Sequence, residues 1–267
     1  MINADECLLF LKKIILQAGL KALEIYQTKD FEIKKKNDNS PLTRADLVSH
    51  EIIYKALSKH YPDIPILSEE TCDLFSVSNP NNLFWCIDPI DGTKEFIKRN
   101  DEFTINIALI SNKKPIMGVI YAPALDQLYY ASKGKGSFYE TKKLSKKIIA
   151  KKADKYNLIF AVSRSHISDK TQNFLDSFVS KTIKNIGSSL KLCIVAKGDV
   201  DCYPRFGPTS FWDISAGHII VKESGGYVLD KNFNEIEYDF TKGYLNSDFF
   251  AVNRFFYEEH LNDQKKY

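Results

Sequence analysis

The sequence has no run of about 18 apolar residues, so we expect no membrane-spanning helix. It has five cysteines among 267 residues, an odd number without Cys-x-x-Cys spacing, which indicates free thiols in a reducing compartment. The first residues, Met1–Glu6, are acidic and lack the basic segment that opens a signal peptide. We therefore expect a cytoplasmic protein, with peripheral association with the inner membrane left open.

The chain also lacks a strong excess of either charge. Its 37 Lys and Arg and 34 Asp and Glu residues leave a net charge of +3, too small to indicate a nucleic-acid partner. Lysines gather in the segment Lys133–Lys155, which has few aromatic residues for stacking bases and is interpreted as an exposed hairpin at a lobe boundary. The 44% hydrophobic content permits one large domain, which we expect to have two lobes, residues 1–135 and 156–267.

One stretch, Trp85–Phe96, combines a buried strand with two carboxylates. The apolar run ends at Asp88, and Pro89, which has no backbone N–H, is expected to take the chain out of the sheet. Asp88 and Asp91 would then lie together at a turn into a helix, where they repel each other unless a cation lies between them. The stretch alone leaves two interpretations: Asp91 caps the helix, or the two acids hold a divalent cation beside a phosphate.

Two helices are predicted before this stretch. Apolar residues three and four apart over Leu8–Ile25 form the stripe of an amphipathic helix, and a short strand is predicted over Phe31–Lys34. A second helix is predicted over Thr43–His60, where Thr43 and Asp46 fit a capping box. Asp46 also has a competing interpretation as a group close to a metal-bound water.

Further acidic residues follow other apolar segments. Pro65–Ser68 is predicted to be a short strand that ends at Glu69 and Glu70, and ligands collect at such strand ends. Alternating segments at 103–110, 116–121 and 127–131 predict an antiparallel hairpin and a third strand. Asp213 opens a helix over Ile214–Glu223 and is either its N-cap or another carboxylate of the same site.

The second half carries polar and basic residues at the ends of predicted strands. Ser163 ends a buried strand and His166 follows it, although a lone histidine in this position is more often structural. The Gly187–Ser189 turn precedes a helix that carries Lys191, and backbone N–H groups at such a helix start can approach an anion. Another strand ends at Tyr203–Arg205.

The chain resembles the inositol monophosphatase superfamily of Mg²⁺-dependent, lithium-sensitive phosphatases in three motifs: Ser68-Glu69-Glu70, Asp88-Pro89-Ile90-Asp91-Gly92-Thr93 and Trp212-Asp213. Within that superfamily it looks most similar to the bacterial 3′(2′),5′-bisphosphate nucleotidases, in Asp38-Asn39-Ser40-Pro41, Gly187-Ser188-Ser189-Leu190-Lys191 and Tyr203-Pro204-Arg205. This resemblance implies a mixed α/β fold, the layered α/β/α/β/α sandwich of the inositol monophosphatase and fructose-1,6-bisphosphatase type. One departure is Arg44, where relatives often carry a small or acidic residue.

The resemblance also implies a role for particular residues. The implied metal ligands are Glu69, Asp88, Asp91, Asp213 and the backbone carbonyl of Ile90. Asp46 and Thr93 match positions that orient or activate the attacking water. The implied substrate-binding residues are Gly92, Thr93, Ser163, His166, Gly187, Ser188, Lys191, Tyr203, Arg205 and Asp213.

The implied activity is hydrolysis of adenosine 3′,5′-bisphosphate to AMP and phosphate by a metal-activated water, with two or three Mg²⁺ ions and a role in sulfur metabolism. The sulfated analogue (PAPS, converted to APS) is an additional candidate substrate. An inositol or sugar monophosphatase with the same metals is the alternative, although three cationic side chains, His166, Lys191 and Arg205, favour two phosphates. A non-catalytic nucleotide sensor is disfavoured because every metal carboxylate is present, and monomer or homodimer is left open.

Overall fold

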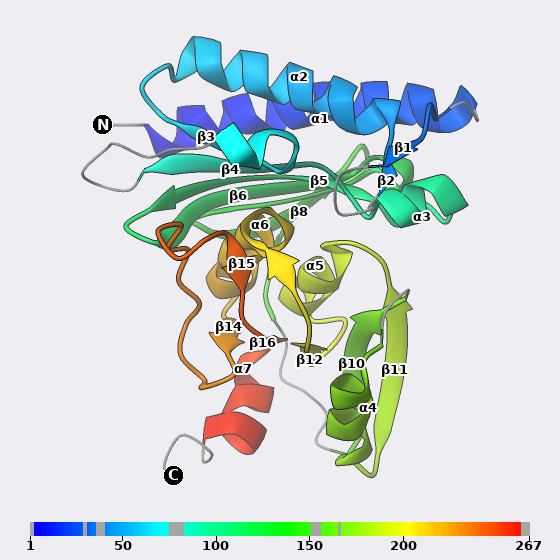
Figure 1. The fold of residues 1–267 in the computed structure, drawn as a ribbon. Helices are drawn as coiled ribbons and strands as arrows, with labels where there is room; N and C mark the ends of the chain where they lie inside the picture. Colours follow the sequence, from blue (N-terminus) through cyan, green and yellow to red (C-terminus); the bar gives the residue numbers. More distant parts are fainter. Residues whose placement is uncertain are drawn as a thin grey trace.

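The computed structural model describes residues 3–28, 31–35, 41–74, 83–150, 156–164 and 167–262. Helices and sheets alternate in layers, with α1 and α2 outermost, then a sheet, then α5 and α6, then a second sheet with α4 and α7 beyond it (Figure 1). This arrangement confirms the layered α/β/α/β/α sandwich. His166, the loop Asp38–Ser40 and the tail Asp263–Tyr267, about which the sequence prompted expectations, lie outside the described residues.

The elements have the following bounds. The helices are α1 (Ala4–Thr28), α2 (Arg44–His60), α3 (Thr93–Lys98), α4 (Asp169–Asp176), α5 (Leu190–Lys197), α6 (Phe211–Glu223) and α7 (Arg254–Phe256). The larger sheet has the order β3 (Ile66–Ser68), β4 (Phe84–Asp91), β5 (Thr104–Ser111), β6 (Lys114–Ala122), β7 (Gln127–Ser132), β8 (Gly136–Thr141) and β9 (Leu144–Ile148). The second sheet has the order β11 (Lys181–Ile186), β10 (Leu158–Ser163), β12 (Cys202–Arg205), β16 (Phe249–Val252) and β14 (Tyr227–Asp230). Small sheets pair β1 (Lys34–Lys35) with β2 (Pro41–Leu42) and β13 (Thr209–Ser210) with β15 (Leu245–Asn246).

Alternate residues of the central strands pack on opposite faces of the larger sheet. In β4, Trp85 and Ile87 belong to the core formed with α1 and α2, whereas Phe84 and Cys86 belong to the core formed with α5 and α6. Because both faces are covered, β4 and β5 are buried over almost their whole length. The predicted hairpin and third strand are confirmed as β5, β6 and β7, which pair antiparallel.

Strand β4 continues past the proline at which we expected it to end. Asp88 pairs with Asn106 of β5, and after a shift in register Asp91 pairs with Thr104. Pro89 therefore lies in a bulge, which accommodates a residue that cannot donate a ladder hydrogen bond. The prediction that the chain leaves the sheet at Pro89 is wrong, and both carboxylates lie on the strand itself.

The second sheet is covered on both faces, like the first. Its outer face packs with α4 and α7 in a core that includes Phe160, Leu175 and Phe256. Parallel pairing of β10 with β11 and β12 brings the ends of these strands to one edge, as Figure 1 shows beside α5. Helices α5 and α6 lie between the two sheets (Figure 1).

Two predicted boundaries differ from the structure. The strand predicted over Phe31–Lys34 is wrong, because the described strand is only Lys34–Lys35 and Glu32 has a φ of 46°, which breaks extended backbone. Helix α6 begins at Phe211, earlier than the predicted Ile214. The hairpin predicted in the lysine-rich segment is confirmed as β8 and β9, and most of β9 is exposed.

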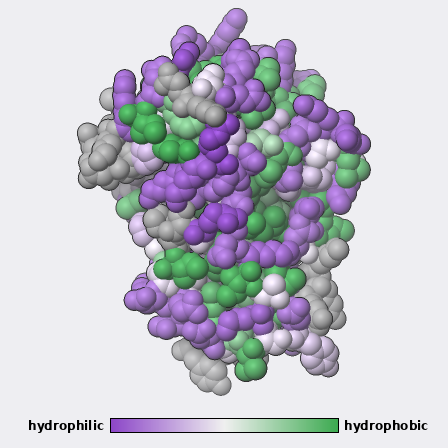
Figure 2. Space-filling view, turned by 90° about the vertical axis from the view of Figure 1, so that its right-hand side faces the viewer, coloured by the Kyte–Doolittle hydropathy of each residue, from purple (hydrophilic) through white to green (hydrophobic). Residues whose placement is uncertain are grey.

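Among the described residues, no helix is both long and apolar enough to cross a membrane. On the face in Figure 2, hydrophilic residues cover most of the upper part, and hydrophobic residues gather below the middle.

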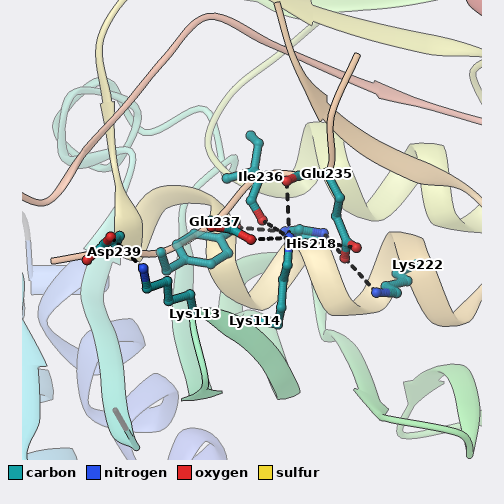
Figure 3. A network of polar contacts seen from close by, with 9 residues as sticks. Lys113, Lys114, His218, Lys222, Glu235, Ile236, Glu237 and Asp239 are labelled. Carbon is teal, nitrogen blue, oxygen red and sulfur yellow. Dashed lines mark hydrogen bonds and ion pairs between the residues drawn. The ribbon is translucent and has the colours of Figure 1, made fainter. Parts of the chain in front are cut away.

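A buried histidine in the middle of α6 helps to fix this helix, whose first turn carries Asp213. His218 is fully buried, its Nδ1 lies 2.9 Å from the Tyr238 hydroxyl, and its Nε2 lies 3.3 Å from Glu235 Oε1 (Figure 3). Glu235 also accepts a hydrogen bond from Lys222 at 2.5 Å. The His218 contact, and then Lys222, lower the pKa of Glu235 to about 2.

We expect Glu235→Gln to lower the free energy of unfolding at neutral pH by about 1–2 kcal/mol, because it removes two charge-assisted contacts of a half-buried carboxylate. Since the folded-state pKa of Glu235 lies below its unfolded value, this stability is present above about pH 4.5 and is lost as the pH falls towards 2. Urea unfolding of wild type and Glu235→Gln between pH 7 and about pH 3 should therefore show a difference in the free energy of unfolding that becomes smaller as the pH falls. Glu237→Gln, at a more exposed neighbour of Lys114, is the matched control.

Candidate active site

Three carboxylates from distant parts of the chain meet at one point. Asp88 and Asp91 come from the bulged end of β4, and Asp213 comes from the first turn of α6. One oxygen of each lies within 4.8 Å of the others. Asp88 is buried and the other two are half-buried, so little water is available to screen the three carboxylates from one another.

The electrostatics of this acidic cluster oppose full ionisation. Burial raises the pKa of Asp91, although the Lys191 ammonium opposes that shift. Burial and then the negative charge of Asp91 raise the pKa of Asp213. Glu69, which follows β3, lies close enough to raise both pKa values. A set of crowded carboxylate oxygens is suited to a hard divalent cation.

The bulge fixes the geometry of the residues between the two aspartates. Ile90 N–H donates to Asp88 Oδ1 at 3.1 Å, which turns that carboxylate back onto its own strand. The Ile90 carbonyl lies 3.2 Å from the Thr93 hydroxyl. Helix α3 begins at Thr93 with Gly92 as its N-cap residue, so the interpretation of Asp91 as the cap is wrong. Gly92 has a φ of 86°, a conformation that favours glycine.

Asp46 combines the two roles that the sequence left as alternatives. Its Oδ2 accepts from the Thr43 backbone N–H at 2.8 Å, which completes the predicted capping box of α2. Its Oδ1 lies 3.3 Å from the Thr93 hydroxyl. Asp46 is fully buried. The capping hydrogen bond holds its carboxylate in one position, in which the second oxygen faces the Thr93 hydroxyl.

Asp213 is held by a second capping box. The N-cap of α6 is Ser210, whose backbone N–H donates to Asp213 Oδ2 at 2.7 Å. Asp213 therefore occupies the third helical position and is not the N-cap. The Ser-x-x-Asp spacing at Ser210 and Asp213 is the sequence signal for this arrangement.

A cavity opens beside the acidic cluster. Of the predicted site residues, it is lined by Asp91, Gly92, Ser163, Ser188, Lys191, Tyr203, Arg205 and Asp213. Thr93 and Gly187 are not among the lining residues, and His166 is outside the described residues. The lining residues that sequence reasoning missed are Lys94, Glu95, Ser189, Leu192, Thr209 and Ile214.

Two cations face this cavity from the second half of the chain. Lys191 is buried, and its Nζ donates to the carbonyls of Ile186 at 3.3 Å and Ser188 at 2.5 Å. Burial lowers the pKa of Lys191 to about 8, although Asp91 opposes that shift. Arg205 donates to the Pro208 carbonyl, and its buried Nε has no hydrogen-bond partner within the part of the chain that the structure describes. The lining of the cavity therefore combines carboxylates of the acidic cluster with cationic side chains.

Asn106 of β5 is a site residue that the sequence analysis did not identify. Its side chain is buried, accepts a hydrogen bond from the Ser189 hydroxyl at 2.8 Å and lies 3.5 Å from Asp91 Oδ2. It also lies 3.4 Å from the Trp212 carbonyl, so it joins β4, α5 and α6. The available signal was a lone amide in an otherwise apolar strand.

The profile of the inositol monophosphatase family matches residues 3–266. The chain belongs to the inositol monophosphatase family. This membership confirms the resemblance found in the three acidic motifs.

Within the family, the chain is 42% identical over 233 residues to the 3′(2′),5′-bisphosphate nucleotidase CysQ of Salmonella typhimurium, with 87% of this chain and 94% of that protein covered. It is 41% identical over 233 residues to CysQ of Escherichia coli K12, with the same coverage.

Solved structures of family members have the same fold. CysQ from Bacteroides thetaiotaomicron superimposes with a TM-score of 0.80 at 34% identity and covers 93% of this chain and 97% of its own. An IMPase from Thermotoga maritima superimposes with a TM-score of 0.78 at 27% identity and covers 95% and 94%.

Proposed function

We propose that this protein is a Mg²⁺-dependent phosphatase that hydrolyses adenosine 3′,5′-bisphosphate to AMP and phosphate. The observation that carries the proposal is one cavity that is lined both by Asp91 and Asp213 of the acidic cluster and by Lys191 and Arg205. Relatives that are 41–42% identical are named 3′(2′),5′-bisphosphate nucleotidases, which supports the same activity here.

The residues of the acidic cluster fit a hard divalent cation, since all their donor atoms are carboxylate oxygens. In the proposal, Asp88, Asp91 and Asp213 hold two or three Mg²⁺ ions together with Glu69 and the Ile90 carbonyl. Bound Mg²⁺ would polarise the phosphate, acidify a water and neutralise the leaving oxygen.

The water-orienting residues of the proposal are Thr93 and Asp46. The Thr93 hydroxyl, between Asp46 Oδ1 and the Ile90 carbonyl, accepts a hydrogen bond from the attacking water and passes its own proton towards Asp46. Asp46 is suited to this role because its other oxygen is already fixed by the α2 cap.

In the proposal, the phosphate that does not react binds beside Lys191 and Arg205. Lys191 and the free Nε of Arg205 supply charge there, and the Ser188 and Ser163 side chains supply hydrogen bonds. Gly92, Gly187, Tyr203 and His166 complete the proposed substrate contacts. This division assigns most metal ligands to the lobe at 1–135 and the nucleotide contacts to the lobe at 156–267.

The decisive experiment measures phosphate release from adenosine 3′,5′-bisphosphate, PAPS and inositol 1-phosphate, with and without Mg²⁺ and Li⁺. We expect kcat/KM for adenosine 3′,5′-bisphosphate to exceed that for inositol 1-phosphate by about 10²-fold or more, because the inositol ester leaves Lys191 and Arg205 without a second phosphate. Activity should need Mg²⁺ and fall with Li⁺. A preference for inositol 1-phosphate would contradict the substrate assignment and leave the metal site standing.

A further inference from the structure

Glu102 joins the two sides of the cavity without lining it. It lies between α3 and β5, and its side chain is 15% exposed. Its Oε2 accepts from Arg164 Nε at 2.7 Å and from the Gly187 backbone N–H at 2.7 Å, while its Oε1 accepts from Arg164 Nη2 at 2.6 Å. Arg164 also donates to the Asn185 carbonyl at 2.7 Å. One carboxylate thus holds the ends of the parallel strands β10 and β11.

The turn that Glu102 holds packs closely against Glu102 itself and against the loop that follows Asp91. A Cβ on Gly187 would lie 2.7 Å from Glu95 Cγ and 2.9 Å from the Glu102 carbonyl. A Cβ on Gly92 would lie 3.2 Å from both the Glu102 carbonyl and Ser188 Cβ. The loop after Asp91, the backbone of Glu102 and the turn before α5 are therefore in direct contact.

The position of Lys191 depends on this turn. Lys191 lies in the first turn of α5, and its Nζ donates to the carbonyls of Ile186 and Ser188, which flank Gly187. A displacement of the turn therefore moves the ammonium relative to the acidic cluster. A ligand that places one phosphate at the acidic cluster and another beside Lys191 is sensitive to that distance, whereas a ligand without the phosphate beside Lys191 is not.

We propose that Glu102 is a positioning residue that sets the distance between the acidic cluster and Lys191, and thereby the preference for a bisphosphate. This inference rests on the proposed function. Glu102 itself is not among the residues that line the cavity. It acts through Gly187 and Arg164, whose hydrogen bonds to it are charge-assisted.

The test compares wild type with Glu102→Ala and Glu102→Gln. For adenosine 3′,5′-bisphosphate, we expect Glu102→Ala to raise KM about 10- to 30-fold and to change kcat less than about 3-fold, since charge-assisted hydrogen bonds are lost away from the reacting phosphate. For 3′-AMP, which lacks the 5′-phosphate, KM should rise less than about 3-fold. Glu102→Gln keeps an acceptor for Gly187 N–H and should give an intermediate KM.

A binding measurement without metal separates this role from a merely structural one. By calorimetry, AMP should bind Glu102→Ala about 10-fold more weakly than wild type, and adding Arg164→Ala should weaken it little further because both act through one contact. The matched control is Glu258→Gln, in the exposed Arg254–Glu258 ion pair, whose N–O distance of 2.6 Å equals that of the Arg164–Glu102 pair. This variant should change neither the KM for adenosine 3′,5′-bisphosphate nor the affinity for AMP.

The outcomes distinguish the two proposals. Equal KM increases for both nucleotides, or unchanged AMP affinity in both Glu102 variants, would overturn the role of Glu102 alone. A wild-type protein that neither binds AMP nor prefers the bisphosphate would overturn the proposed function together with this inference. Thermal unfolding of each variant identifies any protein that has lost its fold. If Glu102→Ala does not fold, the KM values and the AMP affinity of Glu102→Gln test the proposal.

Discussion

Asp213→Asn should abolish Mg²⁺-dependent phosphate release and, at the same time, stabilise the metal-free protein. We expect kcat/KM to fall about 10³-fold or more, because a neutral amide cannot replace a carboxylate in the acidic cluster. The asparagine oxygen can still accept from Ser210 N–H, so the α6 cap should survive. Removal of one of three crowded charges should raise the metal-free Tm by about 2–4 °C, which corresponds to roughly 1 kcal/mol in a chain of this size.

The pH dependence of stability is a second test of the Asp213→Asn variant. The pKa values of Asp91 and Asp213 are raised in the fold by burial, so the folded state binds more protons than the unfolded chain. Metal-free wild type should therefore lose stability as the pH rises from about 4 towards neutral, and Asp213→Asn should show a flatter profile. Differential scanning fluorimetry with and without Mg²⁺ measures both effects. Asp169→Asn, at an exposed acid in the first turn of α4, is the control, and a destabilised metal-free Asp213→Asn protein would contradict the repulsion argument.

Thr93→Val should lower kcat about 10²- to 10³-fold with little change in KM for the substrate or in Mg²⁺ affinity, because it removes a proton relay but no carboxylate. The methyl group that replaces the hydroxyl fills the same space, while Asp46 and the Ile90 carbonyl lose their shared donor. The Thr43–Asp46 capping box is untouched, so stability should change by less than about 1 kcal/mol.

Steady-state kinetics at saturating Mg²⁺, with Tm as a check on folding, test this prediction. Thr182→Val removes a hydroxyl that lies 3.2 Å from Asn157 Oδ1, far along the chain in β11, and should leave kcat unaltered. If Thr93→Val instead raised the Mg²⁺ requirement while keeping kcat, Thr93 would support the metal site and would not orient the water.

Much of the fold follows from local patterns. The stripe over Leu8–Ile25 predicts α1, and alternation in 103–131 predicts β5, β6 and β7, because burial repeats with the period of each element. The α2 capping box was readable because its two members, Thr43 and Asp46, are three residues apart. The bulge at Pro89 was not readable, since it depends on whether β5 continues to pair beyond the proline.

The sequence by itself determined the carboxylates of the acidic cluster, their motifs and the family. Only the tertiary structure decided which other side chains and backbone groups form hydrogen bonds around this cluster. Asn106 and Ser189 are 83 positions apart and Glu102 and Gly187 are 85 apart, so no local pattern links either pair. The physical reason is that a side chain's own type predicts what it can bind, whereas its partner is set by the packing of both sheets on α5 and α6.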